Sequence, residues 1–175
     1  PQAAMQLMAD YGVRNVFLPP TALKLMRQAN VKHSGVKLRS IFSGGESLGA
    51  ELIEWVRATF GVDVHEIYGQ TECNLVLANN SNLFPIRPGS MGKPTPGFDV
   101  RIVNEQGEEQ PRNARGIVGV RVPNPVTMLE YWQNPDATAK KYVNGFLLTG
   151  DLGVQDDDGY FWYVSREDDV ITTAG

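Results

Sequence analysis

The sequence has few of the residues on which several common kinds of protein depend. Its single cysteine and two histidines exclude an internal disulfide framework and a cluster at zinc-ligand spacing. It contains no basic tract of five or more residues, and 16 Lys and Arg against 20 Asp and Glu give a net charge of −4. Its longest apolar runs fall far short of the roughly 18 residues of a membrane span. We therefore expect no nucleic acid partner and no membrane span, and composition predicts a cytoplasmic protein.

Two apparent active-site motifs are incomplete. Residues 45–49 match G-x-S-x-G between a predicted strand and a predicted helix, where a serine hydrolase places its nucleophile. A hydrolase would need a later histidine, and the only one, His65, lies inside a predicted strand. We interpret Ser47 instead as a helix cap beside a ligand-facing turn. Gly92-Lys93-Pro94 resembles the end of a Walker A motif, but proline replaces the required serine or threonine, which favours a turn.

Two acidic or nucleophilic features favour structural roles. Asp156-Asp157-Asp158-Gly159 lacks the alternating ligand spacing of an EF-hand loop and predicts a hairpin turn. Cys73 has neither a histidine partner nor a basic flank, so we expect a structural thiol. No covalent nucleophile is therefore predicted.

The first part of the chain alternates strands with helices. Apolar residues at helical spacing predict a helix within 1–10 and another that enters at Pro19-Pro20-Thr21. A third predicted helix runs from a Ser47 cap to about Phe60, where Gly61 ends it. The predicted strands are 13–18, 38–43 and 62–68. Alternation of this length predicts parallel strands, with ligands at their carboxyl ends.

The pattern changes after about Asn79. Apolar residues then alternate with polar ones, which is the period of a β-strand. The alternating segments are Phe98, Val100 and Ile102; Val118, Val120 and Val122; and 160–164. The predicted fold is a parallel α/β piece, part of a doubly wound subdomain, followed by an antiparallel β-sheet or partial barrel.

Tyr68-Gly69-Gln70-Thr71-Glu72 is the most informative segment. By itself it predicts a helix start, in which Thr71 caps and Glu72 favours the helix dipole. Two other segments favour a nucleotide site instead. Gly44-Gly45-Glu46 ends the neighbouring strand in a turn that lets backbone approach a flat base. Thr149-Gly150-Asp151 places a carboxylate in a loop, where it could accept hydrogen bonds from ribose hydroxyls.

These motifs resemble those of AMP-forming adenylating enzymes, and the resemblance covers nearly the whole chain. The motifs stand in the family's order: Ser43-Gly44-Gly45-Glu46-Ser47, Tyr68-Gly69-Gln70-Thr71-Glu72, Gly89-Ser90-Met91-Gly92-Lys93-Pro94, Thr149-Gly150-Asp151 and Ser165-Arg166-Glu167-Asp168-Asp169. Within that superfamily the chain looks most like medium-chain and acetate-type acyl-CoA synthetases. Amino-acid-adenylating domains of peptide synthetases share these motifs, and a stand-alone module that binds AMP or ATP is the alternative outside the enzyme class.

The resemblance implies contacts to the base and phosphates of ATP. The turn Gly45, Glu46 and Ser47 would contact adenine, and the Tyr68 ring would stack on it. The residues that would line the ATP site are Glu66, Ile67, Tyr68, Gly69, Gln70 and Thr71. The Thr71 hydroxyl would donate to the α-phosphate.

The resemblance also implies metal and sugar contacts. Glu72 would ligate Mg²⁺, which prefers a carboxylate and phosphate oxygens. Asp151 would hold the ribose hydroxyls, and Arg166 would approach ribose and phosphate. Asp168 matches the hinge about which a C-terminal domain rotates, and Ala174-Gly175 would begin the segment on the coenzyme A side.

The expected domains follow from these assignments. Residues 1–86 would form a partial α/β subdomain with the adenine and phosphate motifs, 87–165 a β-rich subdomain with the ribose-binding aspartate, and 166–175 a hinge segment. The substrates implied are ATP, a carboxylic acid and coenzyme A. No phosphate loop ending in Pro-Lys-Gly and no lysine-bearing C-terminal domain are found, so we expect an excised middle segment that forms no acyl-adenylate alone.

Overall fold

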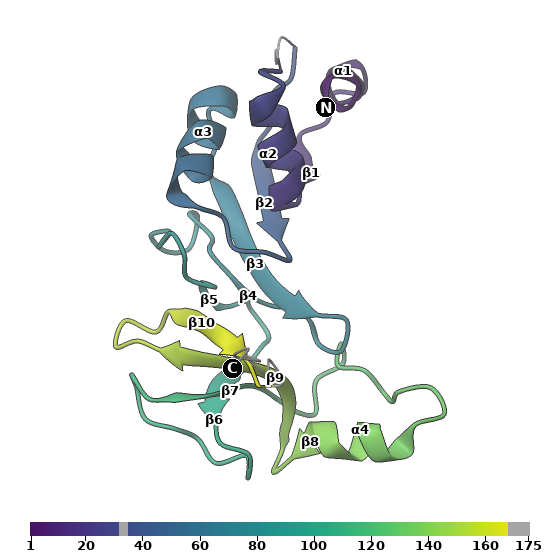
Figure 1. Cartoon of the computed structure of the whole chain (residues 1–175), viewed down its shortest axis with the longest axis vertical. Coiled ribbons are helices and arrows are strands. Elements are labelled where there is room, and N and C mark those ends of the chain that lie inside the picture. The colour runs from purple at the N-terminus through teal and green to yellow at the C-terminus, as the bar shows by residue number, and fades with distance from the viewer. Residues whose placement is uncertain (32–34, 168–175) are drawn as a thin grey trace, which may run out of the picture. The chain divides into compact units, whose positions relative to one another are not determined.

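The computed structural model describes residues 1–31 and 35–167 (Figure 1). The chain divides into two compact units. Unit 1 comprises Pro1–Tyr68 and Ala78–Gly92, and unit 2 comprises Gly69–Leu77 and Lys93–Gly175.

Unit 1 contains the predicted parallel α/β structure. Its elements in chain order are α1 (Gln2–Asp10), β1 (Asn15–Phe17), α2 (Pro20–Gln28), β2 (Ser40–Gly44), α3 (Ala50–Phe60) and β3 (Val64–Gln70), the last two residues of which belong to unit 2. Strand β2 pairs in parallel with β1 on one side and with β3 on the other. The predicted alternation of helices and parallel strands is confirmed.

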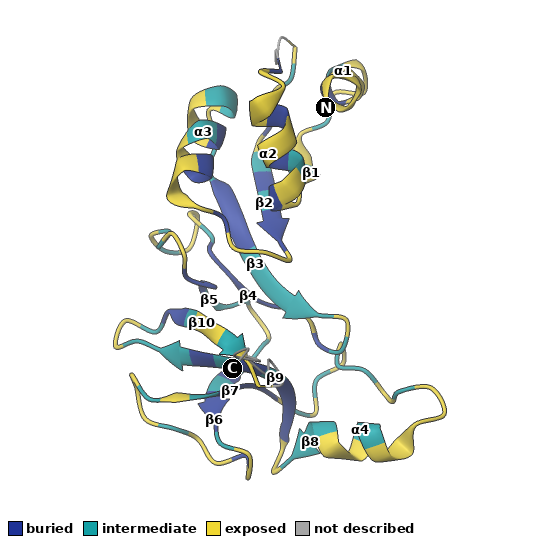
Figure 2. Ribbon diagram, viewed as in Figure 1, coloured by how far each residue is buried: buried dark blue, intermediate teal, exposed yellow. Residues whose placement is uncertain are grey.

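Amphipathic helices cover this sheet. Leu23 and Met26 are the buried apolar residues of α2, while Leu52, Ile53 and Val56 are those of α3. Both helices have buried and exposed positions on different sides in Figure 2. These residues join one apolar cluster with residues of β2 and β3, which is the burial that stabilises short helices in proteins.

The ends of α3 confirm one sequence prediction and correct another. Gly61 ends the helix with φ of 68°, a left-handed conformation that favours glycine. The prediction that Ser47 caps this helix is wrong, because the cap position is Gly49 and no side chain bonds there. The backbone N–H of buried Leu48 instead donates to Glu66. That contact holds the preceding loop, so the helix begins only at Ala50.

Unit 2 contains the predicted antiparallel structure. Its elements are β4 (Asn74–Ala78), β5 (Lys93–Pro94), β6 (Val100–Val103), β7 (Arg115–Arg121), α4 (Pro135–Lys141), β8 (Tyr142–Val143), β9 (Phe146–Gln155) and β10 (Phe161–Arg166). An antiparallel sheet has the order β10-β9-β7-β6, and β8 pairs with β9. The predicted antiparallel sheet is therefore confirmed.

The acidic hairpin between β9 and β10 forms as predicted. Asp156 accepts hydrogen bonds from the Tyr160 backbone N–H at 2.8 Å and the Trp162 indole N–H at 2.9 Å. The Gly159 N–H donates to the Asp156 carbonyl at 3.0 Å. Asp156 thus organises the turn with its own side chain.

The segment after β3 folds as a turn and a strand rather than as the helix that its local pattern predicts. The Cys73 N–H donates to the Gln70 carbonyl at 3.1 Å, and β4 begins at Asn74 with φ of 62°. A Cβ on Gly69 would lie 1.9 Å from the Asn74 carbonyl oxygen, so this turn requires glycine. Within residues 1–31 and 35–167, no helix is long and apolar enough to cross a membrane.

Candidate functional site

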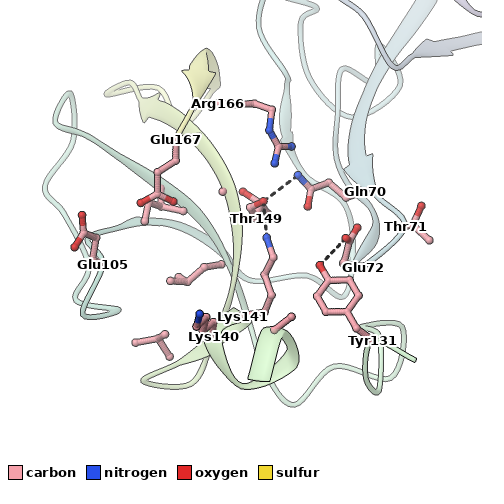
Figure 3. A pocket seen from close by; sticks show the side chains of 15 residues that line it. Gln70, Thr71, Glu72, Glu105, Tyr131, Lys140, Lys141, Thr149, Arg166 and Glu167 are labelled. Carbon is pink, nitrogen blue, oxygen red and sulfur yellow. Dashed lines mark hydrogen bonds between the residues drawn. The ribbon is translucent and has the colours of Figure 1, made fainter. Parts of the chain in front are cut away.

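A cavity of about 1040 Å³ lies within unit 2 (Figure 3). The end of β3 and the turn after it border the cavity with Gln70 and Glu72, and the segment before α4 borders it with Tyr131. Residues of β7, α4, β8, β9 and β10 and of the turn after β6 complete the lining. Polar and charged side chains point into it, which is suited to a polar ligand.

Asp151 connects two of the motifs that the sequence predicts to share a site. Its carboxylate is buried, and Gln70 Nε2 donates to its Oδ2 at 2.7 Å. Arg166 Nη1 lies 3.5 Å from its Oδ1. The Asp151 N–H also donates to the Thr149 hydroxyl at 3.1 Å. The predicted ribose carboxylate therefore contacts two side chains that line the cavity, those of Gln70 and Arg166.

Glu72 is oriented by a residue that sequence reasoning did not identify. The Tyr131 hydroxyl donates to Glu72 Oε1 at 2.8 Å, and the Met128 N–H donates to the Glu72 carbonyl at 2.7 Å. Burial, together with this carboxylate partner, raises the pKa of Tyr131 to about 12, so the phenol stays protonated and remains a donor. Thr71 is exposed beside Glu72 and also lines the cavity.

Lys141 is the second cavity residue that the sequence analysis missed. Its Nζ donates to the Thr149 carbonyl at 3.1 Å, from the last turn of α4. A sequence signal for this helix did exist, because Asn134-Pro135 places a good cap before proline at the first helical position. No local signal pairs Tyr131 with Glu72, since they are 59 residues apart.

Cys73 has the structural character that its sequence context predicts. It is fully buried, and burial raises the pKa of its thiol to about 11. Because the thiolate is the nucleophile, this thiol is poorly reactive at neutral pH.

Unit 1 contains the residues predicted to contact the adenine base. Gly45, Glu46 and Ser47 are exposed in the loop after β2, and Gly45 has φ of 91°. The Glu46 carboxylate lies 4.0 Å from Lys24 Nζ in an exposed ion pair. This loop therefore presents backbone and small side chains to solvent.

Glu66 has a structural contact in addition to its predicted role. Its carboxylate is buried and accepts the Leu48 N–H at 3.0 Å. Burial raises the pKa of Glu66, and the Leu48 bond partly opposes that change. Ile67 and Tyr68, which follow in β3, are half-buried. The side chain of Glu66 thus fixes the loop that carries the predicted adenine contacts.

Several predicted roles have no test in the structure. Asp168, Ala174 and Gly175 lie outside the described residues. In the part of the chain that is described, no group of three His, Cys, Asp or Glu side chains could hold a metal ion. The roles of Glu72 as a metal ligand and of Thr71 as a phosphate donor stay predictions.

Comparison with known proteins identifies relatives over nearly the full chain. A family model described as AMP-binding enzyme matches residues 1–132. The human acyl-coenzyme A synthetase ACSM3, mitochondrial, is 38% identical over 179 residues, which cover 100% of this chain and 30% of the relative. The uncharacterized acyl-CoA ligase YtcI of Bacillus subtilis (strain 168) is 37% identical over 177 residues, which cover 98% of this chain and 32% of the relative.

A solved structure has the same fold. The anthranilate CoA ligase AuaEII in complex with anthranoyl-AMP superposes with a TM-score of 0.81 at 28% identity, over 95% of this chain and 32% of that one. The chain thus spans about a third of that structure, and about 30% of the length of the curated ACSM3 relatives that it matches.

These relatives correct the expected location. The prediction of a cytoplasmic protein is wrong, because ACSM3 from both Homo sapiens and Pongo abelii is named mitochondrial. Composition failed here since one unpaired cysteine and a net charge of −4 do not distinguish one reducing compartment from another.

The comparisons agree with the family resemblance and with the observed fold. The family model covers both the loop after β2 and the turn after β3, where the sequence places the nucleotide contacts. This chain belongs to the AMP-binding enzyme family.

Proposed function

We propose that this chain contributes the nucleotide-binding part of an enzyme that activates a carboxylic acid with ATP and transfers the acyl group to coenzyme A. The observation that carries the proposal is that Gln70, Glu72 and Arg166 line one cavity of unit 2, and that Gln70 and Arg166 both contact the Asp151 carboxylate. These residues come from three motifs, and the first lies about eighty positions before the second.

The contacts of Asp151 support binding of a ribose. Gln70 and Arg166 contact the carboxylate, one at each oxygen. An ionised carboxylate only accepts hydrogen bonds, and it does so through two oxygens. Two adjacent ribose hydroxyls match two such acceptors. Arg166, with its fork of donors, lies beside this carboxylate and would reach the sugar or its phosphate.

The residues around Glu72 fit the Mg²⁺ ion that the family uses with ATP. A single carboxylate is enough, since Mg²⁺ usually completes its shell with phosphate oxygens and water. Tyr131 occupies Glu72 Oε1, and no other side chain of the described residues bonds Glu72, so Oε2 is available as a ligand. When bound, Mg²⁺ neutralises the negative charge of the phosphates. Thr71, beside Glu72, would donate to the α-phosphate.

The proposed reaction has two steps. A carboxylate oxygen of the acid bonds to the α-phosphorus of ATP as the bond to the pyrophosphate oxygen breaks, which gives an acyl-adenylate. The thiolate of coenzyme A then bonds to the acyl carbon, and the acyl–oxygen bond breaks to release AMP. Neither step needs a protein nucleophile, in keeping with the buried, poorly reactive Cys73. Positioning and charge neutralisation are the contributions left to the protein.

The names of the relatives support this choice of substrates, since they are acyl-CoA synthetases and CoA ligases. By resemblance, Gly45, Glu46, Ser47 and Tyr68 stay the proposed adenine contacts.

Binding of AMP to the chain tests the nucleotide site. Calorimetry should detect AMP, and 2′,3′-dideoxy-AMP should bind more weakly because it lacks the hydroxyls that Asp151 would hold. Asp151→Asn should lower the affinity for AMP at least roughly tenfold, as expected for the loss of a charge-assisted hydrogen bond. The difference in affinity between AMP and 2′,3′-dideoxy-AMP should become smaller. Asp157→Asn, at an exposed hairpin carboxylate, is the matched control. Equal loss in both variants would contradict the ribose assignment.

The reaction itself is tested by pyrophosphate release. The chain should be expressed with whatever its gene encodes on either side and supplied with Mg²⁺, ATP and a panel of carboxylic acids. Acid-dependent pyrophosphate followed by coenzyme A-dependent AMP is expected. ATP cleavage to ADP, or no dependence on any acid, would contradict the proposal.

A further inference from the structure

Lys141 brings to the cavity a positive charge that its own surroundings leave unneutralised. Its Nζ donates to one neutral group, the Thr149 carbonyl, at 3.1 Å. It forms no ion pair with any residue in 1–31 or 35–167, whereas Arg166 is paired with Asp151 at 3.5 Å. A lysine ammonium has three donors, so two remain for a ligand.

The fold fixes the place of this ammonium group. Helix α4 starts with the Asn134 side chain accepting the Ala137 N–H at 3.1 Å, and Lys141 is its last residue. In Figure 3 the side chains of Lys141 and Arg166 point toward Thr149 from opposite sides. Gly150, with φ of 80°, lies within β9 near both of these cations.

Distances at Gly150 show how close the two cations come to this residue. A Cβ on Gly150 would lie 3.6 Å from Lys141 Nζ and 3.7 Å from Arg166 Nη2. The residue after Gly150 is Asp151, the proposed ribose contact. A nucleotide whose sugar is bound at Asp151 therefore has two cationic side chains within the same cavity.

The simpler role of a lysine at a helix end is to interact with the last carbonyls of its own helix. Lys141 instead bonds a carbonyl of β9, on the wall of the cavity. The acidic side chains of the cavity lining lie away from Lys141. Glu72 is in the turn after β3, and Glu105 and Glu167 are on other parts of the lining, so an anionic ligand is favoured beside Lys141. Those carboxylates repel a phosphate, whereas Lys141 and Arg166 beside Gly150 attract it.

We propose that Lys141 is a further phosphate-binding residue of the nucleotide site, acting with Arg166 on either side of Gly150. The inference rests on the proposed function, since it takes the ligand to be an adenine nucleotide bound through Asp151. The ligand class is a nucleoside monophosphate or the matching phosphate of a longer nucleotide.

Comparison of AMP with adenosine tests the proposal directly, because the two ligands differ only in the phosphate. Affinities are measured by calorimetry in EDTA, so that no metal takes part. Lys141→Met should lower the affinity for AMP roughly tenfold and leave the affinity for adenosine nearly unchanged. Lys141→Arg should recover most of the AMP affinity because it restores the charge. Binding too weak for calorimetry is followed through the amide NMR shifts of Gly150 and Asp151.

Lys37→Met is the matched control, since it removes the same charge from an exposed residue that does not line the cavity. It should weaken AMP far less than Lys141→Met does. An equal loss of AMP affinity in the two variants, or an unchanged AMP affinity in Lys141→Met, overturns the role of Lys141. The proposed function still stands in that case if the wild-type chain binds AMP. If neither ligand shifts Gly150 or Asp151 at millimolar concentration, the nucleotide site and this inference both fail.

Discussion

Gln70 Nε2 donates a 2.7 Å hydrogen bond to Asp151 Oδ2, across 81 residues of sequence. The same amide nitrogen lies 3.2 Å from the Thr149 carbonyl oxygen. One side chain of the Tyr68–Glu72 motif thus bonds both the first and the last residue of the Thr149-Gly150-Asp151 motif. The amide is suited to this position because it donates to a buried carboxylate without adding charge.

Replacing that amide with a carboxylate should destabilise unit 2. In Gln70→Glu, a second negative charge would face buried Asp151 and the donor would be lost. We expect the free energy of unfolding at pH 7 to fall by about 1–3 kcal/mol, measured by urea denaturation. The loss should shrink as the pH approaches about 4, because protonation of one carboxyl relieves the repulsion.

Gln106→Glu provides the control for this prediction. Gln106 is exposed in the turn after β6, and the substitution adds the same charge. Its effect on unfolding should stay within about 0.5 kcal/mol. If both variants lose the same stability, the cost comes from net charge and not from the Gln70–Asp151 contact.

Loss of the Tyr131 hydroxyl should lower the affinity for Mg·ATP more than the affinity for AMP. Tyr131→Phe removes the donor to Glu72, the proposed metal ligand, and leaves the ring in place. We expect Mg·ATP to bind roughly fivefold more weakly, the value of one ordinary hydrogen bond, while AMP in EDTA changes less. Since the pKa of Tyr131 is about 12, wild-type affinity should show no tyrosine-dependent step between about pH 6 and 9.

Tyr142→Phe separates orientation of Glu72 from support of the loop. The Tyr142 hydroxyl donates to the Met128 carbonyl, on the same segment that carries Tyr131, but it makes no contact with Glu72. Loss of the Tyr142 hydroxyl should change the affinities for Mg·ATP and AMP by the same factor. A Tyr131→Phe variant that behaves in the same way would argue against a specific role at the metal ligand.

The sequence predicted much of the fold because its periodicities are strong. Helices α2 and α3, the parallel strands and the antiparallel second half all follow from apolar spacing and from turns such as Asp156–Gly159. Gly61 ends α3 as predicted because its positive φ is a local property. Position 151 was chosen as a site residue from a predicted loop. That loop prediction is wrong, because Asp151 lies in β9, but the structure does bring it to Gln70 and Arg166.

What the sequence could not provide are contacts made at long range. The Ser47 prediction failed because Glu66, on a neighbouring strand, binds the Leu48 N–H and so delays the start of α3. The pattern at Thr71 favours a helix locally, but the chain turns back into β4. The pairing of Tyr131 with Glu72 likewise depends on tertiary packing, which local residue preferences do not contain.

The buried carboxyl of Glu66 should make stability depend on pH. Burial raises its pKa above the ordinary value of 4.5, so the folded state binds the proton more tightly than the unfolded state. Stability should therefore fall as the pH rises from about 4.5 through the raised folded pKa, and level off above it. Glu66→Gln keeps an acceptor for the Leu48 N–H but cannot ionise, so its stability relative to wild type should rise across that window.

Urea unfolding of both proteins at several values between about pH 4 and 8 measures this difference. Other titrating groups, including His65, whose pKa burial lowers, act in both proteins and cancel in the comparison. A difference that is constant with pH, or that changes in the opposite direction, would show that Glu66 ionises in the folded state as readily as in the unfolded chain.

Two alanine substitutions distinguish a helix cap in the structure from the cap that the sequence pattern suggests. Asn134 caps α4 through its bond from the Ala137 N–H at 3.1 Å, so Asn134→Ala should lower the free energy of unfolding by about 1 kcal/mol. Ser47 is exposed and makes no cap bond to α3, so Ser47→Ala should change it by less than about 0.5 kcal/mol. Urea denaturation measures both. An equal loss for Ser47→Ala would mean that α3 begins near Ser47 in solution, and the Leu48–Glu66 contact would then not set the start of that helix.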